Sequence, residues 1–121
     1  MADFNKHKRL LKKADFNHVF NKSVKVSDSL FLILIHKNNT INHARLGLVI
    51  SKKVDKRAVV RNRIKRIVRE SFRNYDFNQN CDFVVLARAK AKQTSNHELF
   101  ESINNLWKQA QQKIKQIRKK K

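Results

Sequence analysis

Residues 52–73 read KKVDKRAVVRNRIKRIVRESFR, and this stretch is the most informative part of the chain. It holds ten Lys or Arg and only two acids, Asp55 and Glu70. Its apolar residues nevertheless recur at the spacing of one helix face, about 100° per residue. We therefore predict a helix over residues 56–75, with Asp55 as its N-cap. The side that this helix should bury carries Val60, Ile64, Ile67, Val68, Ser71, Phe72 and Tyr75.

The opposite side of the predicted helix is densely cationic. Like charges three or four residues apart destabilise an isolated helix by roughly 0.2–0.5 kcal/mol per pair, so a polyanionic partner would offset a real cost. Arg and Lys both bind phosphate, Arg through its planar fork. Any one of these charges could equally be a solvated surface group, but the cluster favours a phosphate-binding surface. Its residues are Asn62, Arg63, Lys65, Arg66, Arg69 and Arg73 on the helix, preceded by Lys52, Lys53, Lys56 and Arg57.

The composition indicates one basic globular domain. The chain has 121 residues, of which 40% are hydrophobic, enough for a single small core. Lys plus Arg number 29 and Asp plus Glu number 9, so the formal charge is 29 − 9 = +20 and the pI is near 10.8. Such a charge attracts nucleic acid. Pro is absent and Gly47 is the only glycine, which excludes glycine-rich phosphate-binding loops.

The cysteine count and the apolar runs favour the cytoplasm. Cys81 is the only cysteine, so no internal disulfide can form, which fits a reducing compartment. No apolar run approaches the roughly 20 residues of a membrane span. The first residues have no apolar core of signal-peptide length.

The rest of the chain predicts a small sheet with helices packed on it. A helix is expected over residues 10–20, strands over 29–36, 44–51 and 82–88, and loops over 37–40 and 89–94. The first two strands should form a hairpin. Ser95 and Glu98 have the spacing of a capping box and should start a last helix, with Trp107 in the core.

These elements define a single-domain α/β sandwich over residues 1–121, in the order helix, strand, strand, helix, strand, helix. Residues 1–9 are expected to be loose, and the basic tail from about residue 113 to 121 is expected to fray.

The sequence offers no catalytic constellation of protein side chains. The nine acids are scattered, although a metal-dependent nuclease needs clustered carboxylates. The five histidines lack zinc-ligand spacing. Cys81 is better explained as a small apolar residue beside a strand than as a nucleophile. Phe16 and Phe20 lie one turn apart, and could be core residues or a platform on which unpaired bases stack.

Several ordered segments resemble the protein subunit of bacterial ribonuclease P. RNRIKRIVRESFR at residues 61–73 resembles the RNR motif of that family. RLLKKADFNHVF at 9–20 resembles its N-terminal helix, RLGLVISKK at 45–53 its strand before the basic loop, and DFVVLAR at 82–88 its last strand. KRA at 56–58 and the ESFR segment resemble the proteobacterial type.

The resemblance implies a function. In that family the protein assists a catalytic RNA subunit, which removes the 5′ leader of precursor tRNA with Mg²⁺ held mainly by the RNA. The protein binds and stabilises the RNA, holds the leader and is expected to be monomeric in the holoenzyme. The fold would contain a left-handed βαβ crossover, against the general preference.

The resemblance also assigns residues to roles. It adds Arg61 to the RNA-binding set, together with Lys52, Lys53, Asn62, Arg63, Lys65, Arg66 and Arg69. It places Phe16, Phe20 and Leu34 in a cleft that holds the leader, with Leu34 where relatives can have a tyrosine. The charge alone would also suit a structural RNA-binding protein such as a ribosomal component. A self-sufficient nuclease and a DNA-binding regulator fit the sequence less well.

Overall fold

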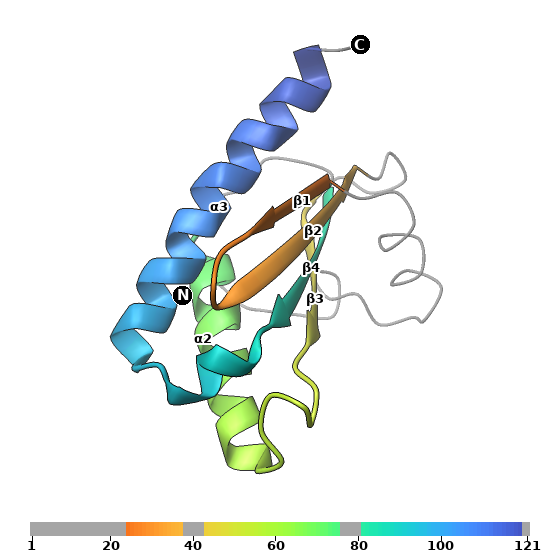
Figure 1. Ribbon diagram of the computed structural model, residues 1–121. Helices are drawn as coiled ribbons and strands as arrows, with labels where there is room; N and C mark the ends of the chain where they lie inside the picture. The colour runs from red at the N-terminus through yellow and green to blue at the C-terminus, as the bar shows by residue number, and fades with distance from the viewer. Residues whose placement is uncertain (1–23, 38–42, 76–80, 120–121) are drawn as a thin grey trace.

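The computed structural model describes residues 24–37, 43–75 and 81–119, with side chains up to Ile114 (Figure 1). In this part of the chain, four strands form one sheet, and two α-helices and a short 3-10 helix accompany it. The elements are β1 (Val24–Ser27), β2 (Phe31–Lys37), β3 (Arg45–Val49), α2 (Ala58–Asn74), β4 (Cys81–Ala87), η2 (Ala89–Gln93) and α3 (Asn96–Lys119).

The strand order is β1-β2-β4-β3, which corrects the predicted hairpin. β2 is antiparallel to both β1 and β4, while β3 lies at the edge and runs parallel to β4. The strands expected over 29–36 and 44–51 are therefore separated by β4 and do not pair. β2 and β4 are the most continuously apolar strands, and pairing them places both in the middle of the sheet, where both faces are covered. β1 was not anticipated.

Helix α2 connects the parallel neighbours β3 and β4. It lies with α3 on the same face of the sheet (Figure 1). β3 and β4 are adjacent parallel strands joined through α2, so these three elements form a βαβ unit. The fold is the α/β sandwich that the sequence predicted, and the hand of its crossover stays a prediction from the family resemblance.

The core between sheet and helices is centred on three aromatic rings. Phe83 of β4, Phe72 of α2 and Trp107 of α3 meet edge to face, with ring centroids 5.6–5.9 Å apart. The Trp107 indole N–H donates to the Ser71 hydroxyl at 2.8 Å, and this hydroxyl donates to the Asn104 side chain. The buried Trp107 indole and the buried Ser71 hydroxyl are therefore both paired, as a stable core requires. Trp107 is fully buried and Cys81 lies in β4 at 2% exposure, as the sequence predicted for both.

The predicted buried side of α2 is confirmed, whereas its predicted N-cap is wrong. Ile64, Ile67, Val68, Ser71 and Phe72 are buried, and Val60 and Tyr75 are half-buried against the core.

Arg57 occupies the cap position of α2 and makes no side-chain capping bond. The Asp55 carboxylate instead accepts a hydrogen bond from the Arg57 backbone N–H at 2.8 Å, two residues along the chain. Asp55 therefore shapes the loop before the helix, because the helix starts later than the sequence indicated.

Helix α3 begins as predicted and runs further than predicted. The Ser95 hydroxyl accepts a hydrogen bond from the Glu98 backbone N–H at 3.2 Å, which is the forward half of a capping box. The helix continues past Lys113 to Lys119, so the expected frayed tail is helical that far. Asp28 ties α3 to the β1–β2 turn, because it accepts from the Leu30 and Phe31 backbone N–H groups and from the Ser102 hydroxyl.

The other face of the sheet carries a smaller apolar cluster. Leu34 of β2 and Val84 of β4 are buried there, at 3% and 0% exposure, and three half-buried residues pack against them: Leu32, Val49 and Leu86. Arg45 and Asp82 form a two-point ion pair beside this cluster, at 2.7 and 2.9 Å. The helix expected over 10–20, with Phe16 and Phe20, lies outside the described residues.

Candidate nucleic-acid interface

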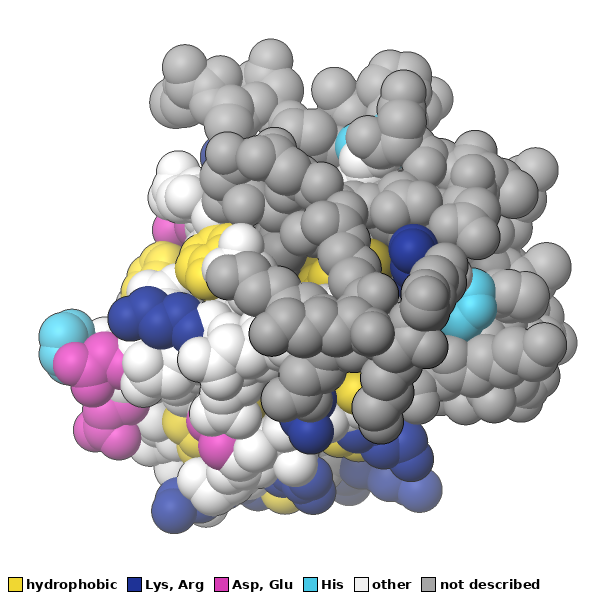
Figure 2. Space-filling view, turned by 90° about the horizontal axis from the view of Figure 1, so that it is seen from above, with side chains coloured by type: hydrophobic (Ala, Val, Ile, Leu, Met, Phe, Trp, Pro, Cys, Tyr) yellow, Lys and Arg dark blue, Asp and Glu magenta, His cyan; other side chains and the backbone are white. Residues whose placement is uncertain are grey.

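The predicted cationic residues lie on α2 and on the loop that leads into it. In the space-filling view, most of the visible Lys and Arg side chains gather along the lower edge and most acids lie toward the left (Figure 2). The eleven residues differ in exposure. Lys52, Lys53, Lys56, Arg57, Asn62 and Arg66 are exposed, whereas Arg61, Arg63, Lys65, Arg69 and Arg73 are half-buried.

Arg57 is paired within its own loop. Its guanidinium donates to both Asp55 carboxylate oxygens, at 3.1 and 2.9 Å. The Arg57 side chain keeps 71% of its surface exposed, and that of Asp55 only 9%. Hydrogen bonds from the Arg57 side chain and backbone lower the pKa of Asp55 to about 2, so this acid is ionised at neutral pH. The pair removes one positive and one negative charge from the balance of the loop.

Arg61 holds the same loop from the helix side. Its guanidinium donates to the backbone carbonyl oxygens of Asp55 and Lys56, at 3.0 and 2.9 Å. These carbonyls come before the helix begins, so no helical hydrogen bond satisfies them. Arg61 therefore fixes the basic loop, residues 51–57, to the first turns of α2.

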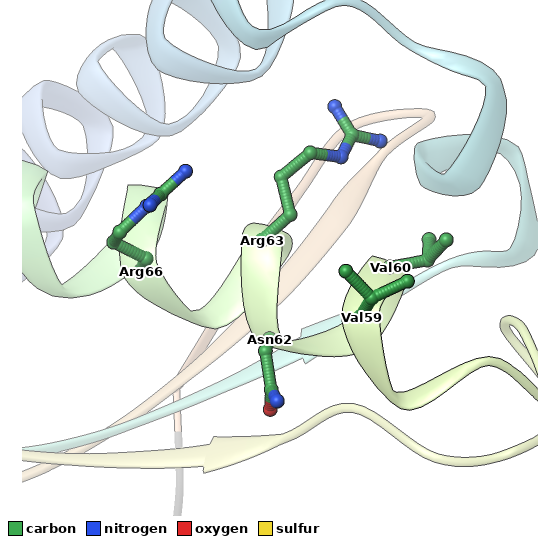
Figure 3. Close-up of a pocket in the computed structure, with 5 residues that line it drawn as sticks. All are labelled: Val59, Val60, Asn62, Arg63 and Arg66. Atoms are coloured by element: carbon green, nitrogen blue, oxygen red, sulfur yellow. The ribbon is translucent and has the colours of Figure 1, made fainter.

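Arg63 reaches in another direction. Its guanidinium donates to the Asn96 side-chain oxygen at 2.6 Å and to the carbonyls of Thr94 and Lys92 at 3.2 and 3.3 Å. Figure 3 shows the Arg63 side chain extending toward η2, while Asn62 points to the opposite side of the helix. Arg63 thus joins α2 to the segment between η2 and α3.

An open groove of about 400 Å³ follows the first turns of α2 (Figure 3). Val59 stands in it at 74% exposure, and it is the one large apolar side chain exposed in the described part of the chain. The groove combines an apolar floor with amide and guanidinium groups. Its residues are Val59, Val60, Asn62, Arg63 and Arg66.

Lys92 was not among the residues predicted from the sequence. Residues 89–94 were predicted to be a connecting loop, but residues 89–93 form η2, which packs beside α2. Lys92 is exposed and lines a second depression together with the basic loop. The only signal in the sequence was a pair of lysines, Lys90 and Lys92. Their place beside α2 could not be predicted, because the contact that brings them there joins residues about thirty positions apart.

The described residues offer little for metal chemistry. Within ranges 24–37, 43–75 and 81–119, no three His, Cys, Asp or Glu come together as metal ligands would. In the same ranges, no helix is long and apolar enough to cross a membrane.

Comparisons with known proteins agree on one family for the chain. A family model described as Ribonuclease P matches residues 4–111. The chain is 45% identical over 105 residues to the ribonuclease P protein component of Vibrio vulnificus strain YJ016, covering 86% of this chain and 88% of that protein. Over 112 residues it is 45% identical to that of Marinomonas sp. strain MWYL1, covering 91% and 84%. Neither relative is a ribosomal protein, so the ribosomal alternative finds no support.

Two solved structures share the fold. The RNase P protein of Staphylococcus aureus superposes with a TM-score of 0.80 at 35% identity, covering 85% of this chain and 94% of that one. The RNase P protein of Thermotoga maritima superposes with a TM-score of 0.72 at 31% identity, covering 81% and 93%.

Proposed function

The chain belongs to the family of bacterial ribonuclease P protein components, and from this premise we propose how its surfaces serve the enzyme. The family supplies the protein subunit of a ribonucleoprotein endoribonuclease that processes the 5′ ends of tRNA, and its partner is the ribonuclease P RNA. The proposal concerns which residues contact the RNA, and how the precursor is held.

The catalytic RNA contacts the exposed cations of α2 and the basic loop. The observation that carries this assignment is the exposure of Arg66 on α2 and of Lys52, Lys53 and Lys56 on the loop beside it. Phosphate contacts of this kind give affinity without reading the base sequence. The half-buried cations Lys65, Arg69 and Arg73 complete the strip.

The single-stranded leader of precursor tRNA lies against the sheet face that carries Leu34. Leu34 is only 3% exposed, so it lies beneath that face and does not itself offer a stacking surface. Phe16 and Phe20, which lie outside the described residues, are the groups proposed to stack with leader bases. Stacking on aromatic side chains tolerates any base and is worth about 1–3 kcal/mol per base. This tolerance suits an enzyme that must accept many leader sequences.

The hydrolytic chemistry belongs to the RNA. We propose that Mg²⁺ is held mainly by oxygen atoms of the RNA, which are the hard ligands that this ion prefers. The protein then contributes by holding the precursor in place at the cleavage site. We propose that one copy of the chain serves each holoenzyme, in the cytoplasm.

Reconstitution with the catalytic RNA tests the leader assignment. At low Mg²⁺ the wild-type chain should support cleavage of precursor tRNA. The variant Phe20→Ala should weaken binding of precursor tRNA by about ten-fold, because one stacking contact of roughly 1–3 kcal/mol is lost. Binding of mature tRNA, which has no leader, is the internal control and should not change. Equal loss of binding for precursor and mature tRNA would place Phe20 in the core. Failure of the wild-type chain to support cleavage by the catalytic RNA would refute the proposed function.

A further inference from the structure

We infer that Lys92 of η2 is a further phosphate-binding residue, at a site shared with the basic loop, and that Arg63 is the positioning residue that holds Lys92 there. The inference rests on the proposed function, because the phosphate belongs to the backbone of the catalytic RNA. The inference separates a positioning role, for Arg63, from phosphate binding, whereas the sequence predicted only one group of RNA-binding residues.

The site is an open depression of about 480 Å³ between two segments that are distant in sequence. At about 30 Å³ per water molecule, it has room for a phosphate group with part of its hydration shell. η2 contributes Lys92, and the loop contributes the other walls. The lining residues are Lys52, Lys53, Val54, Asp55, Lys56, Arg57 and Lys92.

The described residues that line this depression carry a net positive charge, which favours the binding of an anion. Among the described residues that line the depression, Asp55 is the only acid, and both of its carboxylate oxygens accept from the Arg57 guanidinium. No carboxylate of this described lining is therefore left for its four lysines. Hydrogen bonds from Arg57 are the main cause of the low pKa of Asp55, and the charge of Lys92 acts in the same direction. The field of Lys92 thus reaches the loop, although Lys92 comes from another element. Like charges gathered in this way are stabilised by phosphate.

η2 is fixed in place from two sides. Its inner side is anchored by Ala91, which is fully buried in the core. Its end is closed by the Thr94 hydroxyl, which donates to the Lys90 carbonyl at 2.9 Å. On its outer side, Arg63 donates to the Lys92 and Thr94 carbonyls and to the Asn96 side chain. The position of Lys92 therefore depends directly on Arg63.

The geometry of Arg63 suits positioning better than direct phosphate binding. Both terminal nitrogens of its guanidinium are engaged with oxygen atoms of its own chain. A planar fork can bridge three acceptors, whereas a lysine ammonium offers a single point charge. The substitution Arg63→Lys therefore keeps the charge of residue 63 and removes the clamp. This separates the two roles experimentally.

A salt series on binding to the catalytic RNA tests both parts. Lys92→Ala should reduce the slope of log K against log salt by about 0.7–0.9, the value for one phosphate contact. That slope corresponds to about four- to five-fold weaker binding at 0.15 M salt. Arg63→Lys should reduce the slope by a similar amount, and the double variant by no more than either alone. Lys90→Ala is the matched control, because Lys90 is exposed on the same turn but does not line the depression. Thermal melts should show that all four variants fold.

The outcomes separate this inference from the proposed function. An unchanged slope for Lys92→Ala, with tight binding by the wild type, overturns the Lys92 site and leaves the function intact. Additive losses for Arg63→Lys and Lys92→Ala overturn the positioning role, because two independent phosphate contacts would add. Loss in Lys90→Ala equal to that in Lys92→Ala reduces the site to general surface charge. Failure of the wild-type chain to bind the RNA refutes the proposed function itself.

Discussion

The two sides of α2 follow different rules. On the inner side, burial follows the 3.6-residue period, and every predicted residue from Ile64 to Phe72 packs against the sheet and α3. On the outer side, the period indicates only which residues face away from the core. Arg61 and Arg63 are bound to carbonyls of their own chain, whereas Arg66 is exposed. The total of 29 Lys and Arg residues therefore overstates the number of cations that an RNA can use.

The largest effect should come from breaking the inner side. Trp107→Ala removes a fully buried ring that contacts Phe72 and Phe83, and leaves the Ser71 hydroxyl without its donor. We expect the free energy of unfolding to fall by about 3–5 kcal/mol, as for other buried aromatic residues changed to Ala. Urea unfolding followed by circular dichroism measures it. Trp107→Phe keeps part of the ring packing and should lose less. A loss under about 1 kcal/mol for Trp107→Ala would contradict the described core.

An intermediate effect should come from Arg61, which fixes the basic loop to α2. Arg61→Ala leaves the Asp55 and Lys56 carbonyls to solvent and frees the basic loop. We expect a loss of about 1 kcal/mol in the free energy of unfolding, because charge-assisted hydrogen bonds at a partly exposed site are worth little more.

Asn62→Ala at the next position is the matched control for Arg61→Ala. Asn62 is exposed, so this change should stay within about 0.5 kcal/mol. Equal losses for the two variants, again by urea unfolding, would show that Arg61 does not clamp the loop.

The sequence predicted the elements that depend on local spacing and failed where distant segments meet. The period of α2 and the capping of α3 by Ser95 are local, and both were found. The hairpin prediction was wrong because pairing of β2 with β4 joins residues such as Leu34 and Val84, fifty positions apart. β1 was missed for a different reason: its partners in β2 are near in sequence, but the four residues VKVS are too short a run to indicate a strand.

The same limit applies to the interface. The basic residues could be located from the sequence, because charge and helical position are local properties. The sequence could not show which of these residues hold the chain together and which are free to bind RNA. Arg63, for example, donates to Lys92, Thr94 and Asn96, which come after β4 in the sequence. The wrong assignment of Asp55 to the helix cap is instead a local error, because the helix starts later than predicted and the Asp55 carboxylate is held by Arg57, two residues along the chain. The roles of Phe16 and Phe20 stay predictions.

The smallest effect on stability, and the most direct test of an RNA-docking surface, should come from Arg66→Ala. Arg66 is exposed on α2, so its loss should change the free energy of unfolding by less than about 0.5 kcal/mol. The measurement is the slope of log K against log salt for binding of the catalytic RNA, compared with the wild type. The slope should fall by about 0.7–0.9, with unchanged folding, as expected for one lost phosphate contact. An unchanged slope with a folded protein would contradict the assignment of the outer side of α2 to RNA.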